Sequence, residues 1–350
     1  MLDLDDESLL CYVISNQFIN RVTNAESCDS MSTIRDVAKL ADVSIATVSR
    51  VLNNDTTYRM TGETRERVWK AIADLNYKAP ATQHKRGASN VPGAFRKIGC
   101  IVNLRGGKYT DPYYLSLLSG IESYFSENRS EVAFVRTWTE LEDSETLIRT
   151  FSEPLDGLIV MSHLNDATFR YAQSKVPFIV GIDTGYRELD NIEYDHEQAA
   201  QMAVTYLYEK QFREIGFIGG SEGKMPMKQC RRYHTYLNTM LDLGLNIKDE
   251  WVLDCDWNDV TCTRLVERLG RDHLPRSFFA TSDLMAMATL RALANMRVSV
   301  PDEVAVIGLT DIEMSKYANP PLTTIHIPTE SMGEAAAQIL LNRINGDDSL

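Results

Sequence analysis

The stretch MSTIRDVAKLADVSIATVSRVLNN, residues 31–54, decides the fold of the N-terminal part of the chain. Its apolar residues recur at helical spacing in two short blocks, which are separated by the turn Asp42-Val43. Thr33 and Ser44 stand just before the two blocks, where a hydroxyl side chain caps a helix. The spacing therefore predicts two short helices that are joined by a tight turn.

The second predicted helix carries small and polar residues on its outer face. Two short helices with such a face describe a helix-turn-helix, whose second helix seats in a DNA major groove about 12 Å wide. A plain three-helix bundle with a polar surface fits the helix spacing equally well. A third helix is expected to begin near Thr61 and to bury Val68, Ile72 and Leu75.

This run resembles the opening of the LacI/GalR family of bacterial repressors, because D-V-A-x-x-A-x-V-S is followed after one residue by A-T-V-S-R-V-L-N. The resemblance implies sequence-specific DNA binding, with Ile45, Ala46 and Arg50 reading bases in the major groove. It also implies that Thr47 and Ser49 hold the DNA backbone. The complete predicted DNA-binding set is Thr33, Ser44, Ile45, Ala46, Thr47, Ser49, Arg50, Asn53, Lys85 and Arg86.

Charge is distributed unevenly along the chain, whose formal net charge is −13. Residues 1–30 carry a net −5, residues 31–108 carry +8, and residues 109–350 carry −16. A basic block beside an acidic body is typical of a DNA-binding head on a regulatory domain. The charge pattern therefore agrees with a head over residues 31–77.

Residues 1–30 precede the position at which proteins of the family begin, which is Met31 in this chain. We therefore expect this extension to be disordered or to result from a misassigned start. The residues themselves leave one alternative open, a single amphipathic helix, because apolar side chains recur between Leu9 and Ile19.

The linker 78–96 departs from the family's pattern. In the family this segment forms a hinge helix on DNA, and a leucine from it inserts into the minor groove. In this chain the segment contains no leucine, and Pro80 and Gly87 oppose a long helix. We therefore expect a basic linker that contacts phosphates through Lys85 and Arg86 and bends the operator little.

From residue 97 the sequence alternates between apolar runs and helical stretches, which is typical of parallel sheets with helices on both faces. Two lobes are predicted within one ligand-binding and dimerisation domain, 97–350: the first about 97–190 plus 325–350, the second about 191–324. Strands are predicted at 98–103, 132–136, 157–161, 176–183, 215–219, 277–281 and 304–309. Helices are predicted near 113–127, 142–151, 165–174, 196–210, 229–243, 259–269, 283–296 and 330–344.

This body also resembles the family's effector domain, which is related to periplasmic sugar-binding proteins. The blocks VPFIVGID (176–183), SDLMAMATLRAL (282–293) and VPDEVAVIGLTD (300–311) carry the likeness. The expected fold class is an all-α helix-turn-helix head plus an α/β, two-lobed, periplasmic-binding-protein-like effector domain with doubly wound parallel sheets. Such sheets bind ligands at the carboxyl ends of their strands.

Residue by residue, the resemblance implies a sugar pocket. Trp257 would stack on a sugar ring, while Asp183 and Arg232 would form hydrogen bonds with the sugar's hydroxyl groups. Arg231 is the alternative to Arg232. From the residues alone, packing or helix capping explains each of these side chains equally simply. The predicted effector-binding set is Tyr113, Tyr114, Asp183, Arg232, Trp257, Ser282 and Thr310.

Two residues of that set depart from the family's pattern. Many sugar-responsive members carry a carboxylate where Thr310 stands, and Asn or Asp where Ser282 stands. A neutral hydroxyl therefore replaces a charged acceptor, so the identity of the sugar does not carry over.

Common enzyme motifs are absent: the chain has no H-E-x-x-H, G-x-S-x-G, P-loop or G-x-G-x-x-G. Its six cysteines lack metal-ligand spacing, so we expect reduced thiols and neither a metal nor a cofactor. No run of eighteen apolar residues occurs, and the acidic N-terminus opposes a signal peptide. A cytoplasmic protein that is not an enzyme is expected.

The expected function is repression of a carbohydrate-utilisation operon, released by a small sugar. The protein would bind a pseudo-palindromic operator in double-stranded DNA as a homodimer. The alternative is a co-repressor type of regulator, in which a ligand or a phosphoprotein partner strengthens DNA binding. Because the family's chains continue further, we also expect a truncated C-terminus at Leu350.

Overall fold

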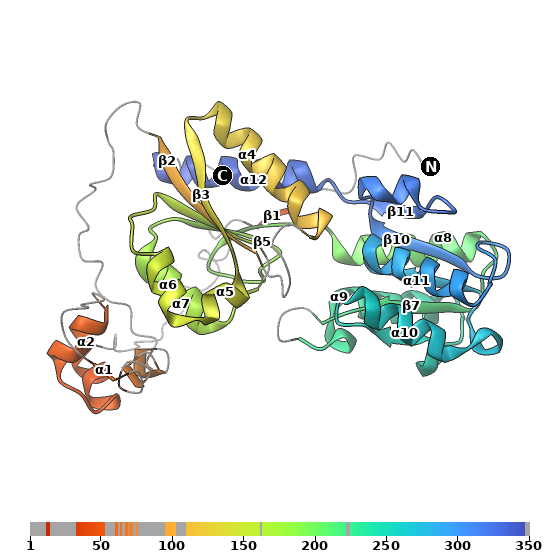
Figure 1. Cartoon of the computed structure of the whole chain (residues 1–350), viewed down its shortest axis with the longest axis horizontal. Helices are drawn as coiled ribbons and strands as arrows, with labels where there is room; N and C mark the ends of the chain where they lie inside the picture. Colours follow the sequence, from red (N-terminus) through yellow and green to blue (C-terminus); the bar gives the residue numbers. More distant parts are fainter. Residues whose placement is uncertain are drawn as a thin grey trace. The chain divides into compact units, whose positions relative to one another are not determined.

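The computed structural model forms two compact units, shown in Figure 1. Unit 1 contains Met1–Val13, Asp111–Gly120 and Ile192–Gly333, and unit 2 contains Ile14–Thr110, Ile121–Asn191 and Glu334–Leu350. The residues whose structure is described are 12–14, 33–52, 60–61, 64, 67–68, 70–72, 75, 95–102, 110–161, 163–221 and 225–346.

The head begins with α1 (Ile34–Leu40) and α2 (Ile45–Leu52). Between them, Asp42 has φ 52°, a left-handed conformation that aspartate tolerates better than most residues. The two predicted helices and their turn are thus confirmed. The head has a core of its own, made by Val37, Ala38, Ala41, Val48, Val51, Val68, Ala71 and Ile72, with Leu75 packed against it.

Sheet A has six strands, in the order β1-β6-β5-β4-β2-β3, and its strands β2, β3, β4 and β5 lie in unit 2. The pairs β2/β3, β2/β4 and β4/β5 are parallel, as the sequence predicts. The strands are β1 (Tyr12–Ile14), β2 (Arg96–Val102), β3 (Ser130–Thr137), β4 (Gly157–Met161), β5 (Ile179–Ile182) and β6 (Asp190–Glu193). The helices α5 (Trp138–Glu142), α6 (Ser144–Thr150) and α7 (Asp166–Lys175) follow β3 and β4.

Unit 1 is built on a five-stranded sheet, sheet B, in the order β11-β10-β9-β7-β8. Its strands are β7 (Ile215–Gly219), β8 (Val252–Asp254), β9 (Ser277–Ala280), β10 (Ala305–Thr310) and β11 (Thr323–His326), and neighbouring strands pair in parallel. Its helices include α8 (His196–Glu209), α9 (Arg231–Asp242), α10 (Asp259–Leu269) and α11 (Asp283–Asn295). The structure also describes the helices α4 (Pro112–Glu127) and α12 (Thr329–Asn345).

Both faces of sheet B are covered. On one face, Tyr233 and Tyr236 of α9 pack on Phe217 of β7, with ring centroids 5.3 and 5.1 Å away. On the other face, residues of α10 and α11 contribute to a second apolar cluster that includes Phe278 of β9. Helices on both faces explain why the central strands are continuous apolar runs.

Each predicted strand of the body is present, but three short strands, β6, β8 and β11, were not predicted. Their sequences, DNIE, VLD and TTIH, are too short or too polar to form an apolar run. Another difference is that the predicted helix 142–151 is α6 alone, which begins at Ser144 because Asp143 leaves the helical conformation and accepts a hydrogen bond from the Thr146 N–H at 2.8 Å. The helix α5 before it was not predicted.

One short strand lies within the N-terminal extension, and the limits of the two units fall close to the predicted lobe limits. Tyr12–Ile14 form a strand at the edge of sheet A, not part of a helix, while the rest of 1–30 lies outside the described residues. The units divide between Asn191 and Ile192 and again between Gly333 and Glu334, where the sequence analysis placed limits near 190 and 325. No helix in the described part of the chain has the length and apolarity to cross a membrane.

Asp283 is a fully buried carboxylate at the start of α11. It accepts hydrogen bonds from the Thr324 hydroxyl of β11 at 2.6 Å and from the Ile312 N–H at 2.9 Å. Gly308 of β10 gives it room, because a Cβ there would overlap the carboxylate. Burial raises the pKa of Asp283 from 3.8 to about 6, against the lowering effect of these two hydrogen bonds.

Replacing Asp283 with Asn should therefore remove a pH dependence from the stability of unit 1. Between pH 4 and 6 the folded protein binds a proton at Asp283 that the unfolded chain has released, so the free energy of unfolding falls as pH rises and levels off above pH 6. The difference in the free energy of unfolding between Asp283→Asn and the wild-type protein should change by up to about 3 kcal/mol over this range. Denaturant unfolding at several pH values measures it. The exposed Asp302→Asn is the control, and a difference that is constant with pH would contradict the prediction.

Candidate DNA interface and effector site

The helix α2 is fixed at its start by two hydroxyl side chains. The Thr47 N–H donates to Ser44 Oγ at 3.0 Å, and the two hydroxyls lie 2.9 Å apart. At the start of α1, the Thr33 N–H and hydroxyl both donate to the Asp36 carboxylate at 2.7 Å, and these bonds lower the pKa of Asp36. Thr33, Ser44 and Thr47 therefore all help to set the position of the two helices.

The outer face of α2 presents the residues that the sequence analysis selected. Ile45 is 45% exposed, although it is a large apolar residue, and Ala46 is exposed as well. Ser49 and Arg50 are half-buried, while Val48 on the opposite face is fully buried. The predicted residues Asn53, Lys85 and Arg86 lie outside the described residues.

The carboxyl edge of sheet B collects short polar segments from four strands. Ser221 follows β7, Trp257 follows β8, Ser282 follows β9, and Asp311 follows β10. Because parallel strands end at the same edge, these segments lie together although they are far apart in sequence. We call this edge, together with the first turn of α9, the sheet B site.

Arg232 and Trp257 meet at the sheet B site. The Arg232 guanidinium lies over the Trp257 ring, 5.1 Å from its centroid. Nη1 of Arg232 donates to the Tyr194 hydroxyl at 3.2 Å and is 3.5 Å from the Thr281 carbonyl oxygen. The indole N–H of Trp257 donates to the Ser221 carbonyl at 2.6 Å, and 38% of the side chain is exposed. The site therefore offers an aromatic face with a cation held against it.

The loop that carries Trp257 is tightly constrained. Asp256 and Trp257 have φ values of 48° and 58°, and Asp256 accepts a hydrogen bond from the Ser221 hydroxyl at 2.8 Å. A Cβ at Gly220 would lie 2.8 Å from the Trp257 backbone nitrogen, so only glycine allows this approach. These contacts fix the direction of the indole ring.

The alternative arginine has another partner. Nη2 of Arg231 lies 2.8 Å from Glu193 Oε2 in an ion pair. The geometry therefore supports Arg232, rather than Arg231, as the arginine of the sheet B site.

Ser282 and Thr310 also lie at the edge of sheet B, where their hydroxyls make local hydrogen bonds. Ser282 caps α11 by accepting from the Met285 N–H at 3.3 Å. Thr310 is nearly buried, and its hydroxyl donates to the Leu309 carbonyl next to it. With φ 133°, Thr310 is in a region that side chains rarely adopt.

Tyr113 and Tyr114 stand in the first turn of α4, with ring centroids 5.2 Å apart and ring planes at 87°. The Tyr113 N–H donates to Asp111 at 3.0 Å, and burial raises the pKa of that carboxyl. Both tyrosines are half-exposed.

At the carboxyl edge of sheet A, Asp183 directly follows β5 with φ 51°. The next residue, Thr184, donates its hydroxyl to Asn191 at 2.7 Å, and its carbonyl oxygen is 3.2 Å from His163 Nδ1. The His163 ring stacks on Tyr186 with centroids 4.7 Å apart. Unit 2 thus has its own group of aromatic and polar side chains at its strand ends.

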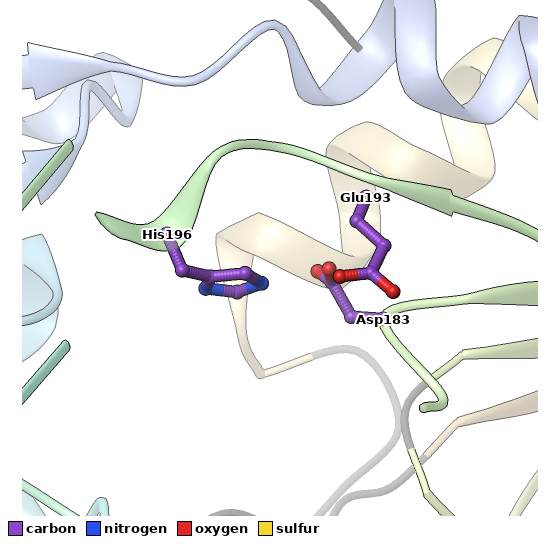
Figure 2. A group of neighbouring side chains, drawn as sticks. All are labelled: Asp183, Glu193 and His196. Atoms are coloured by element: carbon purple, nitrogen blue, oxygen red, sulfur yellow. The ribbon is translucent and has the colours of Figure 1, made fainter. Parts of the chain in front are cut away.

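Figure 2 shows Asp183, Glu193 and His196, which lie on the segment leading from β5 into α8. One possible ligand atom from each lies within 4.8 Å of the others. Their residue types suit a metal ion, but the Glu193 carboxylate is already paired with Arg231. Its charge therefore has a partner within the chain.

A polar hollow of about 200 Å³ in unit 2 lies elsewhere. Arg96 at the start of β2 and Ser130 at the start of β3 line it, together with Leu341 of α12. It is at the amino ends of these strands, opposite the edge where doubly wound sheets bind ligands.

The sequence analysis missed several residues at these edges: Tyr194 and Thr281 beside Arg232, Ser221 beside Trp257, and His163 in unit 2. A usable signal existed for Ser221, Thr281 and His163, because each follows within two residues of a strand's end. Tyr194 follows β6, which was itself not predicted.

Comparison with known proteins identifies both parts of the chain. A family model described as bacterial regulatory proteins, lacI family, matches residues 33–79, and a periplasmic binding protein-like domain matches residues 204–349. The HTH-type transcriptional repressor PurR of Aliivibrio fischeri (strain ATCC 700601 / ES114) is 32% identical over 327 residues, covering 91% of this chain and 93% of its own. The repressor MelR of Bacillus subtilis (strain 168) is also 32% identical, over 328 residues, with 90% and 92% covered.

Solved structures agree with these matches. A transcriptional regulator CelR–cellobiose complex superimposes with a TM-score of 0.68 at 25% identity, covering 91% of this chain and 94% of its own. A lac repressor dimer bound to operator and an anti-inducer superimposes at 0.63 with 20% identity, over 91% and 94%, which supports the fold. The predicted fold class and the expectation of a regulator rather than an enzyme are confirmed by this membership. The chain belongs to the lacI family of bacterial regulatory proteins and is a DNA-binding transcriptional repressor.

Proposed function

We propose that this repressor acts in the cytoplasm on a carbohydrate-utilisation operon and releases its operator when a small sugar binds. The observation that carries the proposal is the Arg232–Trp257 pair at the sheet B site. An exposed indole face packs on the C–H groups of a sugar ring, and a guanidinium donates to its oxygen atoms. A relative of similar fold, CelR, is described in complex with cellobiose, and this supports a sugar as the ligand.

Asp183, Tyr113 and Tyr114 belong to the same proposal. Asp183 would accept hydrogen bonds from sugar hydroxyls, and the tyrosines would supply further aromatic surface. Ser282 and Thr310 can contribute only neutral hydroxyls, so the charged acceptors come from other positions. This favours a ligand that is recognised chiefly by stacking and by the donors of Arg232.

Release of DNA requires that the sugar bind one state of the protein more tightly than another. A coupling of about 1–3 kcal/mol between two sites changes occupancy by roughly 5–150-fold, and it acts equally in both directions. We therefore propose that the operator-bound protein binds the sugar more weakly than the free protein does.

Replacing Trp257 with Ala should weaken the response to sugar at least roughly tenfold while operator affinity without sugar stays unchanged. The measurement is a gel shift on the DNA upstream of the protein's own operon, titrated with candidate sugars. Val260→Ala, which truncates a 59% exposed residue at the start of α10, is the control.

Two outcomes would count against the proposal. Full induction of the Trp257→Ala variant would show that the ligand binds elsewhere. Stronger DNA binding in the presence of the ligand would indicate a co-repressor instead of an inducer.

We propose that α2 enters the major groove and that Arg50 contacts a base edge there, so Arg50→Ala should lower the affinity for operator by about 1–3 kcal/mol. Lys39→Ala removes the same charge from the exposed last turn of α1 and serves as control. Both variants should lose the same affinity for non-specific DNA, because that binding depends on charge. Fluorescence anisotropy with operator and random duplexes measures this. Equal losses on the operator would refute base reading by Arg50.

We further propose that two copies of the chain form a dimer through the 3-10 helix η4 (Glu313–Tyr317), as a surface patch there suggests. Met314 is 45% exposed and Tyr317 is 79% exposed. Residues three apart on a 3-10 helix point the same way, so these two side chains form one apolar patch. A solved lac repressor of the same fold is described as a dimer.

Tyr317→Ala should weaken the dimer by roughly 2 kcal/mol, because large aromatic residues often dominate interfaces. Sedimentation over a range of concentrations measures the dissociation constant. The control is Leu241→Ala, another exposed apolar residue of unit 1, at 65%. If both variants dimerise like the wild-type protein, the interface lies elsewhere.

A further inference from the structure

Three sulfur atoms meet in the core of unit 1. Cys255 follows β8 and stands two residues before Trp257, Cys262 lies in α10, and Met285 lies in the first turn of α11. Cys255 and Cys262 are fully buried and Met285 is 2% exposed, all within one apolar cluster. Three separate elements therefore direct a sulfur side chain to one point.

The contacts among these residues are close. Sγ of Cys255 lies 3.2 Å from Sδ of Met285, and Sγ of Cys262 lies 3.5 Å from the Met285 carbonyl oxygen. Interaction with the Cys255 side chain lowers the pKa of the Cys262 thiol, so the two thiols are near neighbours. Cys230 differs, because its Sγ faces the backbone carbonyls of Gly220, Met225 and Pro226.

We propose that Cys255, Cys262 and Met285 bind a single Cu(I) ion. Thiolate and thioether sulfurs are soft ligands, which favour Cu(I) over hard cations such as Mg²⁺ or Ca²⁺. The thioether carries no charge, so a cluster that contains it suits a monovalent soft ion. Zn²⁺ is divalent and typically takes four ligands from Cys, His and carboxylate side chains. No residue of this cluster belongs to the residue set proposed above for the sugar.

Binding of Cu(I) adds no net charge to the apolar core, because a proton leaves as the ion enters. The Cys262 thiol loses its proton to solvent as the S–Cu bond forms, so that one thiolate neutralises one Cu(I) ion. The Cys255 thiol and the Met285 thioether complete the coordination as neutral donors. Because no net charge enters the core, the penalty for burying an unpaired ion is avoided. Affinity should fall as pH is lowered, since protons compete for the thiolate.

The Cys255 and Met285 sulfurs need to move apart only slightly to bind the same ion. With metal–sulfur bonds of about 2.3 Å, three sulfurs in a trigonal plane lie about 4 Å apart. The Cys255–Met285 contact of 3.2 Å must therefore widen by less than 1 Å. Met285 can supply this movement, because its unbranched side chain has three rotatable bonds.

The ion would also affect the loop that carries Trp257. In the absence of metal, the Cys255 thiol donates to the Gly219 carbonyl at 3.0 Å at the end of β7. A bound ion that draws the Cys255 thiol away breaks this bond next to Gly220, the residue whose missing side chain lets the Trp257 loop approach. Metal binding should therefore change the fluorescence of Trp257, and this change should be absent in Trp257→Phe.

The test is an anaerobic titration of the reduced, full-length protein with Cu(I) in competition with a chromophoric Cu(I) chelator. We expect one equivalent of Cu(I) to be held, with three sulfur ligands in X-ray absorption spectra. Cys255→Ala and Cys262→Ala should each lower the affinity at least a hundredfold. Met285→Leu keeps the volume of the side chain and should lower it about tenfold. Circular dichroism verifies that each variant is folded.

The controls are Cys100→Ser and Cys230→Ser, which remove buried thiols from other places in the chain. Both should bind Cu(I) like the wild-type protein. The proposal is overturned if the wild-type protein yields its copper to an equimolar chelator, if a control loses copper equally, or if Met285→Leu has no effect and the spectra show two sulfurs. None of these results depends on whether a sugar binds at the sheet B site.

Discussion

Parallel pairing of the strands in sheet B is the constraint on which the functional part of unit 1 depends. Since β7, β8, β9 and β10 all run in one direction, the segments that follow them must begin at one edge. Residues that are far apart in sequence are thereby placed side by side. Both the aromatic residue and the arginine of the site depend on this edge, because the loop after β7 supports Trp257, which in turn lies under Arg232.

The first turn of α11 connects three different environments within a few residues. Ser282 caps the helix at the edge of sheet B, and Asp283 joins it to β11 and to the segment after β10. Met285 then contacts the two cysteines. The sheet edge, the buried carboxylate and the sulfur cluster are therefore all in contact with the same turn of one helix.

Glycine positions show how closely the backbone is fitted around these side chains. Gly220 allows the Trp257 loop to approach β7, and Gly308 leaves space for the Asp283 carboxylate. In each case an added methyl group would collide with a residue that the site or the core requires. The strained backbone at Asp256, Trp257 and Thr310 lies at the same edge, as is common where a ligand is bound.

The sequence by itself determined the helix-turn-helix, the alternation of strands and helices, and the family, because these depend on local spacing and on a long specific motif. It also selected Trp257 and Arg232, but left Arg231 as an alternative. Only the tertiary structure distinguishes their surroundings, since Arg231 pairs with Glu193, from a strand too polar to be predicted, while Arg232 lies over Trp257. The burial of Asp283 and the meeting of three sulfurs were likewise decided by tertiary packing, because long-range contacts have no local pattern that a sequence can display.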